Sequence, residues 1–155
     1  MRARPPAGLV QRAIARSIDV ILAGIVVIAM DFFYLVMLGV EGAENTEGAT
    51  NHLVLGSVGS GVMIFGYFVF FETLRGRTPG KKLVGFRVQG PGGARKPNLK
   101  QSVIRNSFLL LMAIPFLGVA LMVAASIFIA VTINNSPTKQ GRHDELAGGT
   151  QVIED

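Results

Sequence analysis

The sequence contains no cysteine, which excludes disulfide bonds, cysteine-ligated zinc and thiol catalysis. Histidine is nearly absent as well: His52 and His143 lie far apart, which argues against a histidine-rich metal site. The sequence shows no Ser/His/Asp arrangement and no carboxylate pair at a spacing typical of catalysis. We therefore predict a protein that needs no cofactor and is not an enzyme.

Charged residues are also scarce, at 16% of 155 residues, whereas 50% of the residues are apolar. The apolar residues are concentrated in three long blocks, Ile18–Leu38, Leu53–Phe71 and Phe108–Ile133. A helix needs about 20 apolar residues to cross the hydrocarbon core of a bilayer, so the first two blocks each suit one crossing. The first block is too long for a signal peptide and contains an aspartate, so we expect it to be retained. The sequence predicts an all-α, multi-pass membrane protein with a single domain over residues 1–155.

The charge distribution predicts which segments lie on each side of the membrane. Basic residues precede the first block and cluster after the second, whereas the connection between these blocks carries three glutamates and no Lys or Arg. The positive-inside rule then predicts a cytoplasmic N-terminus, a helix over 12–38, an outer acidic loop over 39–52, a helix over 53–73 and a basic cytoplasmic loop over 74–105. We attribute the net charge of +5 to this basic loop, which would meet anionic lipid headgroups, and expect no nucleic-acid partner.

The third block, in a hydrophobic segment over 106–133, does not fit a single straight span. One helix over the whole block would measure about 39 Å, which is long for one crossing and short for two. Pro115 and Gly118 interrupt it, and a proline inside a helix forces a kink or a stop. A kinked span would place the tail, residues 134–155, outside, whereas a re-entrant pair of helices would return it to the cytoplasm. We favour the cytoplasmic tail, because "VGFRVQ" in the basic loop and "GTQVIE" in the tail can pair as short strands.

Small residues recur in the second block at small-xxx-small spacing, Gly56 with Ser60 and Ser57 with Gly61. This spacing allows two helices to approach closely in lipid, although Gly and Ser are common in membrane helices generally. The spacing leaves open whether the partner is the first helix or another copy of the chain.

Two polar motifs flank the first two blocks. Arg12, Arg16 and Asp19 share one face of the first helix, so Arg16 can pair with Asp19 while Arg12 faces lipid phosphates. Such a pattern is typical of an interfacial anchor. In Gly76–Gln89, "GRTPGKKLVGFRVQ", Pro79–Gly80 indicates a turn, and the lysines lie at headgroup height before a short strand or an interfacial segment.

Together these segments resemble the RDD family of small bacterial integral membrane proteins. "RAIARSID" is similar to the opening Arg-x-x-Ala-x-x-Ile-Asp element of that family, and "TPGKKLVGFRV" to its T-x-G-K-x-x-x-G-x-x-V element. Arg105-Asn106 resembles the pair that opens the later hydrophobic stretch, and "HDELAGGTQV" the closing His-Asp-x-x-Ala-Gly-Thr element. The four elements occur in the family's order and cover most of the chain. The resemblance implies a bacterial cytoplasmic membrane location.

The chain departs from the family pattern in two places. Many relatives carry an Asp seven residues after the later Arg, where this chain has Met112. The closing element contains an extra glycine, Gly148–Gly149 before Thr150, and lacks the basic run that often precedes it. The family implies little about function: a transport role is usually suggested, some members are associated with sodium–proton exchange, and no catalytic residue set is implied.

Four carboxylates in or near the apolar blocks are the main functional candidates. Asp19, Glu72 and Asp144 are expected to cluster at the inner interface, whereas Asp31 lies about 18 Å further along the first helix than Asp19. Ionisable groups in membrane spans are costly and often mark ion paths, and a desolvated carboxylate has a raised pKa that suits proton–cation exchange.

A structural role is the alternative for the same acids. Asp19 and Glu72 would then pair with Arg12, Arg16 or Arg75, and Asp31 would lie shallow enough to reach outer water. We favour pairing for Asp19 and leave Asp31 open.

Two functions follow as hypotheses. The first is ion transport by cation/proton exchange, which in so small a protein would need a homo-oligomer or a membrane partner subunit. The second is a non-transport scaffold, assembly or accessory protein whose basic loop holds lipid or a partner. The candidate functional or structural residues are Arg12, Asp19, Asp31, Glu72, Thr78, Gly80, Lys81, Arg105, Asp144 and Thr150.

Overall fold

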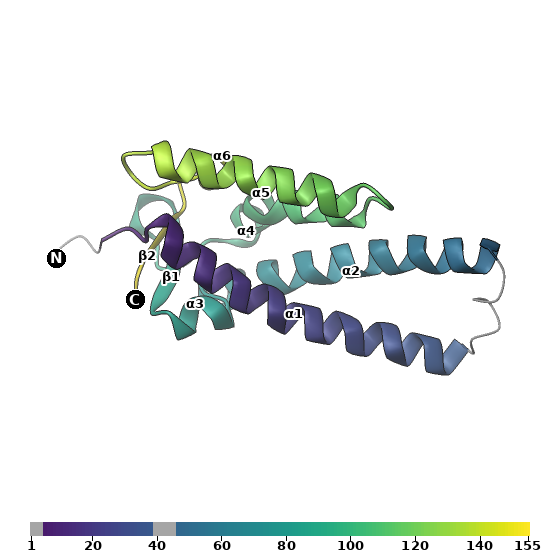
Figure 1. Cartoon of the computed structure of the whole chain (residues 1–155). Helices are drawn as coiled ribbons and strands as arrows, with labels where there is room; N and C mark the ends of the chain where they lie inside the picture. Colours follow the sequence, from purple (N-terminus) through teal and green to yellow (C-terminus); the bar gives the residue numbers. More distant parts are fainter. Residues whose placement is uncertain (1–4, 39–45) are drawn as a thin grey trace.

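A computed structural model of the chain describes residues 5–38 and 46–155 and is predominantly helical (Figure 1). The elements are α1 (Leu9–Leu38), α2 (Thr46–Arg75), α3 (Pro79–Leu83), β1 (Phe86–Gln89), the 3-10 helix η2 (Pro91–Gly93), α4 (Leu99–Asn106), the 3-10 helix η3 (Ser107–Ala113), α5 (Gly118–Asn135), α6 (Arg142–Leu146) and β2 (Gln151–Glu154). The two long helices α1 and α2 extend together from the end of the molecule that holds both termini (Figure 1).

Among the described residues, three helices are long and apolar enough to cross a membrane, over Leu9–Phe33, Val54–Arg75 and Gly118–Asn135. This result confirms the prediction of a mostly helical protein with membrane-length helices. The second helix begins at Thr46 rather than at residue 53, so part of the segment predicted as an acidic loop is helical. The rest of that predicted loop, residues 39–45, lies outside the described residues.

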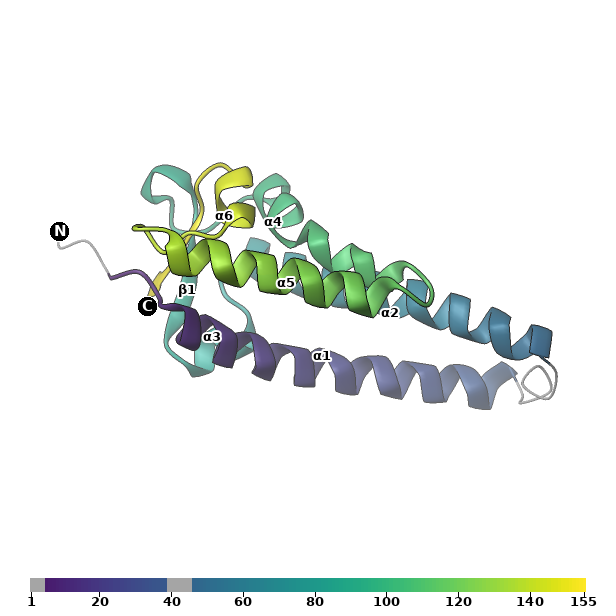
Figure 2. The ribbon, with the colours of Figure 1, turned by 45° about the horizontal axis from the view of Figure 1, so that its top comes forward.

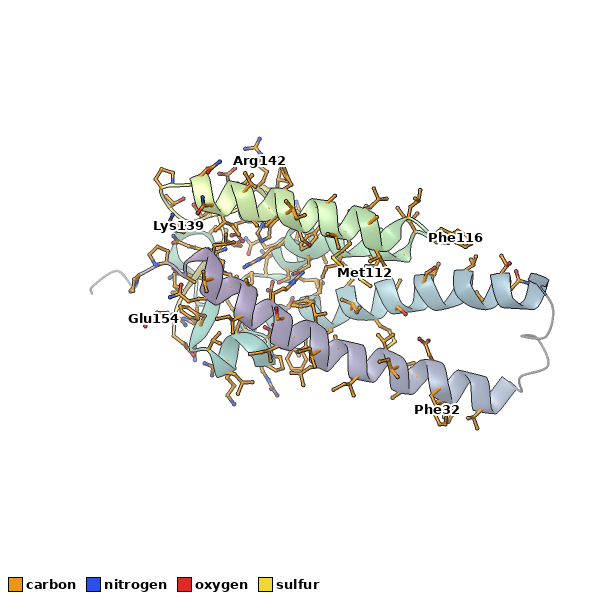
Figure 3. The ribbon with its side chains drawn as sticks, viewed as in Figure 1. Phe32, Met112, Phe116, Lys139, Arg142 and Glu154 are labelled. Carbon is orange, nitrogen blue, oxygen red and sulfur yellow. The ribbon has the colours of Figure 1, made fainter. Side chains whose placement is uncertain are left out.

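The third hydrophobic block is divided in two rather than folded as one kinked helix. η3 ends at Ala113, and α5 begins at Gly118 and returns toward the end with the termini (Figures 1 and 2). Pro115 lies in the turn, where the amide of Gly118 donates to the carbonyl of Ile114 at 2.8 Å. Phe116, at the tip, is 78% exposed and points away from the bundle (Figure 3). The proline thus acts as a stop, and the tip is an apolar turn with local hydrogen bonds.

The apolar core lies where α2 packs against η3 and α1. Its buried members are Ala23, Ile64, Phe68 and Leu109, and Met112 packs against them. Met112, at the position where relatives carry an acid, therefore lies in an apolar environment in this chain.

Gly61 on α2 approaches η3 closely, because a Cβ at this position would lie 2.5 Å from the backbone nitrogen of Ala113. A Cβ at Gly56 would have no atom within 4 Å. One of the two predicted small-residue pairs therefore provides close packing, and its partner is neither the first helix nor another copy but the segment before Pro115.

A small sheet joins the basic segment to the tail. β1 and β2 pair antiparallel, with Val88 opposite Val152, and the N-terminal segment adds a bridge from Pro6 to Ile153. Ala7, Val88 and Val152 form a second buried apolar cluster at this sheet. The two segments expected as strands thus pair, and the predicted basic loop is built from α3, β1, η2 and most of α4.

Candidate functional site: a buried charged cluster

Charged side chains converge where the sheet, α3, α4 and α6 meet the beginning of α1 and the end of α2. Asp19, Glu72 and Asp144 have no exposed surface there. We call the whole group the charged cluster; its members are Arg12, Arg16, Asp19, Glu72, Lys81, Arg105 and Asp144. In this way the structure brings together Arg and Asp/Glu residues that are far apart in sequence.

Asp19 on α1 is held by groups from α2 and the start of α3. Its carboxylate accepts hydrogen bonds from the Thr78 hydroxyl at 2.5 Å, the Gly80 amide at 2.7 Å and the Tyr67 hydroxyl at 2.9 Å. A Cβ at Gly80 would lie 2.3 Å from the carbonyl oxygen of Ala15, so glycine is required for α3 to approach α1 this closely. Both matched residues of the Thr-x-Gly element therefore serve to bind Asp19.

Glu72, near the end of α2, is bound by three donors from the following elements. Its carboxylate forms an ion pair with Lys81, accepts a hydrogen bond from the Asn106 side chain at 2.9 Å, and lies 3.8 Å from Arg105 Nε. Asn106 also donates to the carbonyl of Ser102, which fixes its side chain. The acid at the end of α2 thus connects α2 to α3 and α4.

Asp144 on α6 connects the tail to α1 and α4. It pairs with Arg12 at 2.7 Å and with Arg105 at 3.2 Å, and the hydroxyl of Thr150 lies 3.3 Å from its carboxylate. The amide of Gly141 donates to the same carboxylate at 3.2 Å. Because Arg105 lies within 4.0 Å of both Glu72 and Asp144, it joins the two halves of the cluster.

The pairing within the first helix differs from the prediction. Arg16 forms no ion pair with Asp19 within the described residues; its guanidinium stacks over the ring of Phe68, 3.7 Å from the centroid. Arg12 does not face lipid phosphates but binds Asp144, and its guanidinium also donates to the Lys139 carbonyl at 2.5 Å. The prediction failed because residues spaced by three or four positions are neighbours on a helix, but stronger partners come from other elements.

The closest partners of Glu72 also differ from the predicted ones. We expected arginines of the first helix or Arg75, whereas its closest cationic partner is Lys81 on α3, followed by Arg105 on α4. Arg75 lies near the ring of Phe71, with 5.8 Å between its guanidinium carbon and the ring centroid. Arg75 is exposed at the end of α2.

Burial and charge shift the pKa values of the cluster residues that lie outside the long apolar helices. Burial lowers the pKa of Lys81 to about 8, although Glu72 opposes this shift. Burial also lowers the pKa of His143 to about 3, against the attraction of Asp144. Burial alone would raise the pKa of Asp144, but Arg105, His143 and Arg12 together hold it well below its usual range. At neutral pH, Asp144 is therefore ionised and His143 is neutral.

A cavity of about 140 Å³ lies beside the cluster, between α1 and α5. Its polar wall includes Arg16, Glu72, Lys81 and Arg105, and its other wall is formed largely by apolar residues of α5. We call it the α1–α5 cavity. Among the described residues, no group of three or more His, Asp and Glu side chains is arranged to hold a metal ion.

Asp31 lies apart from the charged cluster. It lines a separate cavity of about 160 Å³ between α1 and α2, together with Gly56, Gly59 and Ser60. Its side chain is partly exposed and has no hydrogen bond or ion pair with any other residue in the part of the chain that the structure describes. Of the ten candidate residues, Asp31 alone lies outside the cluster and its immediate partners.

Sequence reasoning missed several residues of the site. Tyr67 lies within an apolar run, and no pattern in that run distinguishes it from core aromatics. Asn106 was quoted as half of the Arg105-Asn106 element but was not selected, although a polar pair opening an apolar segment is itself a signal. His143 opens the closing family element, but the sequence does not predict that its ring packs edge-on against Phe108 beside Asp144.

Comparison with known proteins agrees with the sequence elements found in this site. No curated protein and no solved structure matches the chain. A family model described as the RDD family matches residues 6–148, a range that includes every member of the charged cluster. The chain therefore belongs to the RDD family.

Proposed function

We propose that the protein is a non-catalytic accessory or scaffold protein of the bacterial cytoplasmic membrane. Its N-terminus, its basic segment and its tail would lie on the cytoplasmic side, and the acidic connection before α2 on the outer side. The proposal is supported by the positive-inside rule and by the position of both termini and the sheet at one end of the bundle (Figure 1).

The observation that carries the proposal is the saturation of the three buried carboxylates. Each of Asp19, Glu72 and Asp144 has at least three donors or cationic partners, and these partners come from several different elements. A carboxylate that exchanges a proton for a cation must release its partners and reach water in turn. These three acids instead connect the helices with one another and with the tail, which is the role of a rigid scaffold.

The basic segment supplies the surface with which this scaffold would meet anionic headgroups. Arg75, Arg77, Lys82, Arg95 and Lys96 surround an open hollow of about 750 Å³ at the same end of the molecule. Clustered Lys and Arg beside a membrane helix attract anionic lipid, at about 1 kcal/mol per residue near the surface.

Cation/proton exchange is the second candidate, and Asp31 favours it. This carboxylate lines a cavity with Ser60 and has no partner among the described residues, as expected for an ion-binding acid. Among the described residues this cavity is lined by α1 and α2, and so small a site would require a second copy or a partner subunit.

A flux measurement separates the two functions. The purified protein is reconstituted in vesicles, and proton movement is followed on addition of sodium, lithium or potassium. We expect no cation-dependent flux from the wild type. Flux that disappears in Asp31→Asn would overturn the scaffold assignment in favour of exchange.

A labelling experiment tests the orientation and the lipid contact. Arg95→Cys and Glu145→Cys each introduce the chain's only thiol, and both should react with an impermeant reagent from the cytoplasmic side. A polarity-sensitive dye at residue 95 should report headgroup contact in vesicles containing phosphatidylglycerol, weakened by high salt. Labelling from opposite sides, or a signal independent of anionic lipid, would contradict the proposal.

A further inference from the structure

The charged cluster contains one more cation than it has carboxylates. Four basic side chains, Arg12, Arg16, Lys81 and Arg105, face three acidic ones, Asp19, Glu72 and Asp144. Arg12 and Arg16 are partly buried and the other five are buried, and an uncompensated charge is costly in such surroundings. The site would therefore be stabilised by one further negative charge.

Two guanidinium groups of the cluster also have unused hydrogen-bond donors. Nη2 of Arg16 and Nη1 of Arg105 are buried and have no hydrogen-bond partner within the described residues. Arg105 is only 4% exposed, so bulk water does not satisfy its free donor. Both residues also line the α1–α5 cavity, so an acceptor bound in that cavity would lie beside these two side chains.

The opposite wall of the cavity is mostly apolar, apart from Ser126 of α5. It is formed by Ile129, Ala130 and Ile133 of α5, with Leu9 and Phe108 at its sides. The neighbouring residues of α5, including Ile127 and Phe128, are exposed and belong to a helix long and apolar enough to cross a membrane. A ligand in the cavity would thus contact arginines on one side and a lipid-facing helix on the other.

The size of the cavity restricts the ligand further. At about 140 Å³ it exceeds the volume of several water molecules, at about 30 Å³ each. It is well below the roughly 300–1,000 Å³ of sites that enclose a whole small molecule. A compact anionic group fits, provided that the rest of its molecule remains outside.

We propose that the α1–α5 cavity binds the phosphate group of one anionic phospholipid, whose acyl chains lie along α5. Arg16 and Arg105 donate to the phosphate oxygens, because guanidinium donors match phosphate geometry. This site differs from the exposed basic surface around Arg95 and does not depend on the scaffold assignment, since a transporter could also hold such a lipid.

The test measures lipid retention by native mass spectrometry, together with the thermal unfolding midpoint in nanodiscs. The nanodiscs contain phosphatidylcholine alone, phosphatidylcholine with phosphatidylglycerol, or phosphatidylcholine with added inorganic phosphate. Arg16→Gln removes one free donor without breaking an ion pair. Ala130→Leu fills the cavity from α5 and leaves every charge in place. Lys82→Gln is the matched control, because it removes one positive charge from the exposed basic surface.

We expect the wild type to retain one phosphatidylglycerol and to show a higher midpoint in its presence. Arg16→Gln and Ala130→Leu should each weaken this binding about tenfold or more, and Lys82→Gln by less than about twofold. Equal retention of phosphatidylglycerol by all variants, or no retention by the wild type, would overturn the proposal of a lipid site in this cavity. If inorganic phosphate in phosphatidylcholine nanodiscs raises the unfolding midpoint as much as phosphatidylglycerol does, the cavity binds a soluble anion. That result would overturn the proposal of a lipid ligand. If Arg16→Gln fails to fold, Ala130→Leu decides the result alone.

Discussion

The two ends of the α1–α2 pair are stabilised in different ways. At the end with the termini, short helices and a sheet surround α1 and α2 and supply donors to the buried acids. We call the halves of α1 and α2 farther from the termini the distal halves. There, side chains such as Ile28, Phe32 and Leu55 are largely exposed, and Phe32 points away from the bundle (Figure 3). Lipid would satisfy such an apolar surface, but it cannot supply hydrogen bonds to a carboxylate.

This contrast explains where buried charge is tolerated in a small membrane protein. A carboxylate next to a helical span requires fixed donors, and these are found where non-helical backbone and polar side chains pack against the span. Asp19 and Glu72 lie at that end and have such partners, whereas Asp31 lies at the other end and has none among the described residues. Substitutions should therefore have large effects at one end and small effects at the other.

The largest effect is expected for Glu72→Ala. The substitution leaves Lys81 and Arg105 buried with less negative charge and removes an acceptor from Asn106. Breaking a buried ion pair on one side costs about 3–5 kcal/mol, so the unfolding midpoint in nanodiscs should fall sharply. Glu145→Ala is the control, because Glu145 pairs with Arg142 on the surface and should contribute less than about 1 kcal/mol. Equal midpoints for the two variants would show that the charged cluster does not stabilise this end.

Two glycine-to-alanine substitutions, one at each end of the α1–α2 pair, compare the two ends without changing any charge. In Gly80→Ala the new Cβ would meet the Ala15 carbonyl and the Asp19 carboxylate, so we expect a loss of about 1–3 kcal/mol. In Gly59→Ala, in the distal half of α2, the Cβ meets no atom within 4 Å, and alanine favours the helix by up to about 1 kcal/mol. The unfolding midpoints should therefore shift in opposite directions. A destabilising Gly59→Ala would indicate that another copy packs against this face.

The helices and the sheet could be predicted from the sequence, whereas the partners of the buried acids could not. Hydropathy and charge bias predict membrane-length helices, and the stop at Pro115 and the strand patterns agree with the divided third block and the sheet. The gathering of Asp19, Glu72 and Asp144 was also expected, from the cytoplasmic ends of the first two helices and a cytoplasmic tail. Their partners were not predictable, because the spacing of residues along a helix identifies only neighbours within about one helical turn. The Thr78–Asp19 bond spans 59 positions and the Arg12–Asp144 bond spans 132.

Acid should loosen the end with the termini and leave the distal halves unaffected. The pKa of His143 is lowered to about 3 when folded, against about 6.5 in an unfolded chain, so between these values the unfolded state binds the additional proton. The stability from this group is fully present above pH 6.5 and falls by about 1.4 kcal/mol per pH unit below it, or about 2 kcal/mol at pH 5. Hydrogen exchange should show residues 136–155 losing protection first. His143→Gln should flatten the pH dependence in this window, and an unchanged slope would assign it to another group.

The smallest effect is expected for Asp31→Asn. This carboxylate is partly exposed, has no partner among the described residues and faces a cavity, so removing its charge should change the free energy of unfolding by less than about 0.5 kcal/mol. The measurement is the unfolding midpoint in nanodiscs, compared with Ser60→Ala, which alters the same cavity without changing charge. A clear destabilisation by Asp31→Asn alone would break the contrast between the two ends. It would show that the carboxylate has a fixed donor, and that this donor comes from outside the described residues.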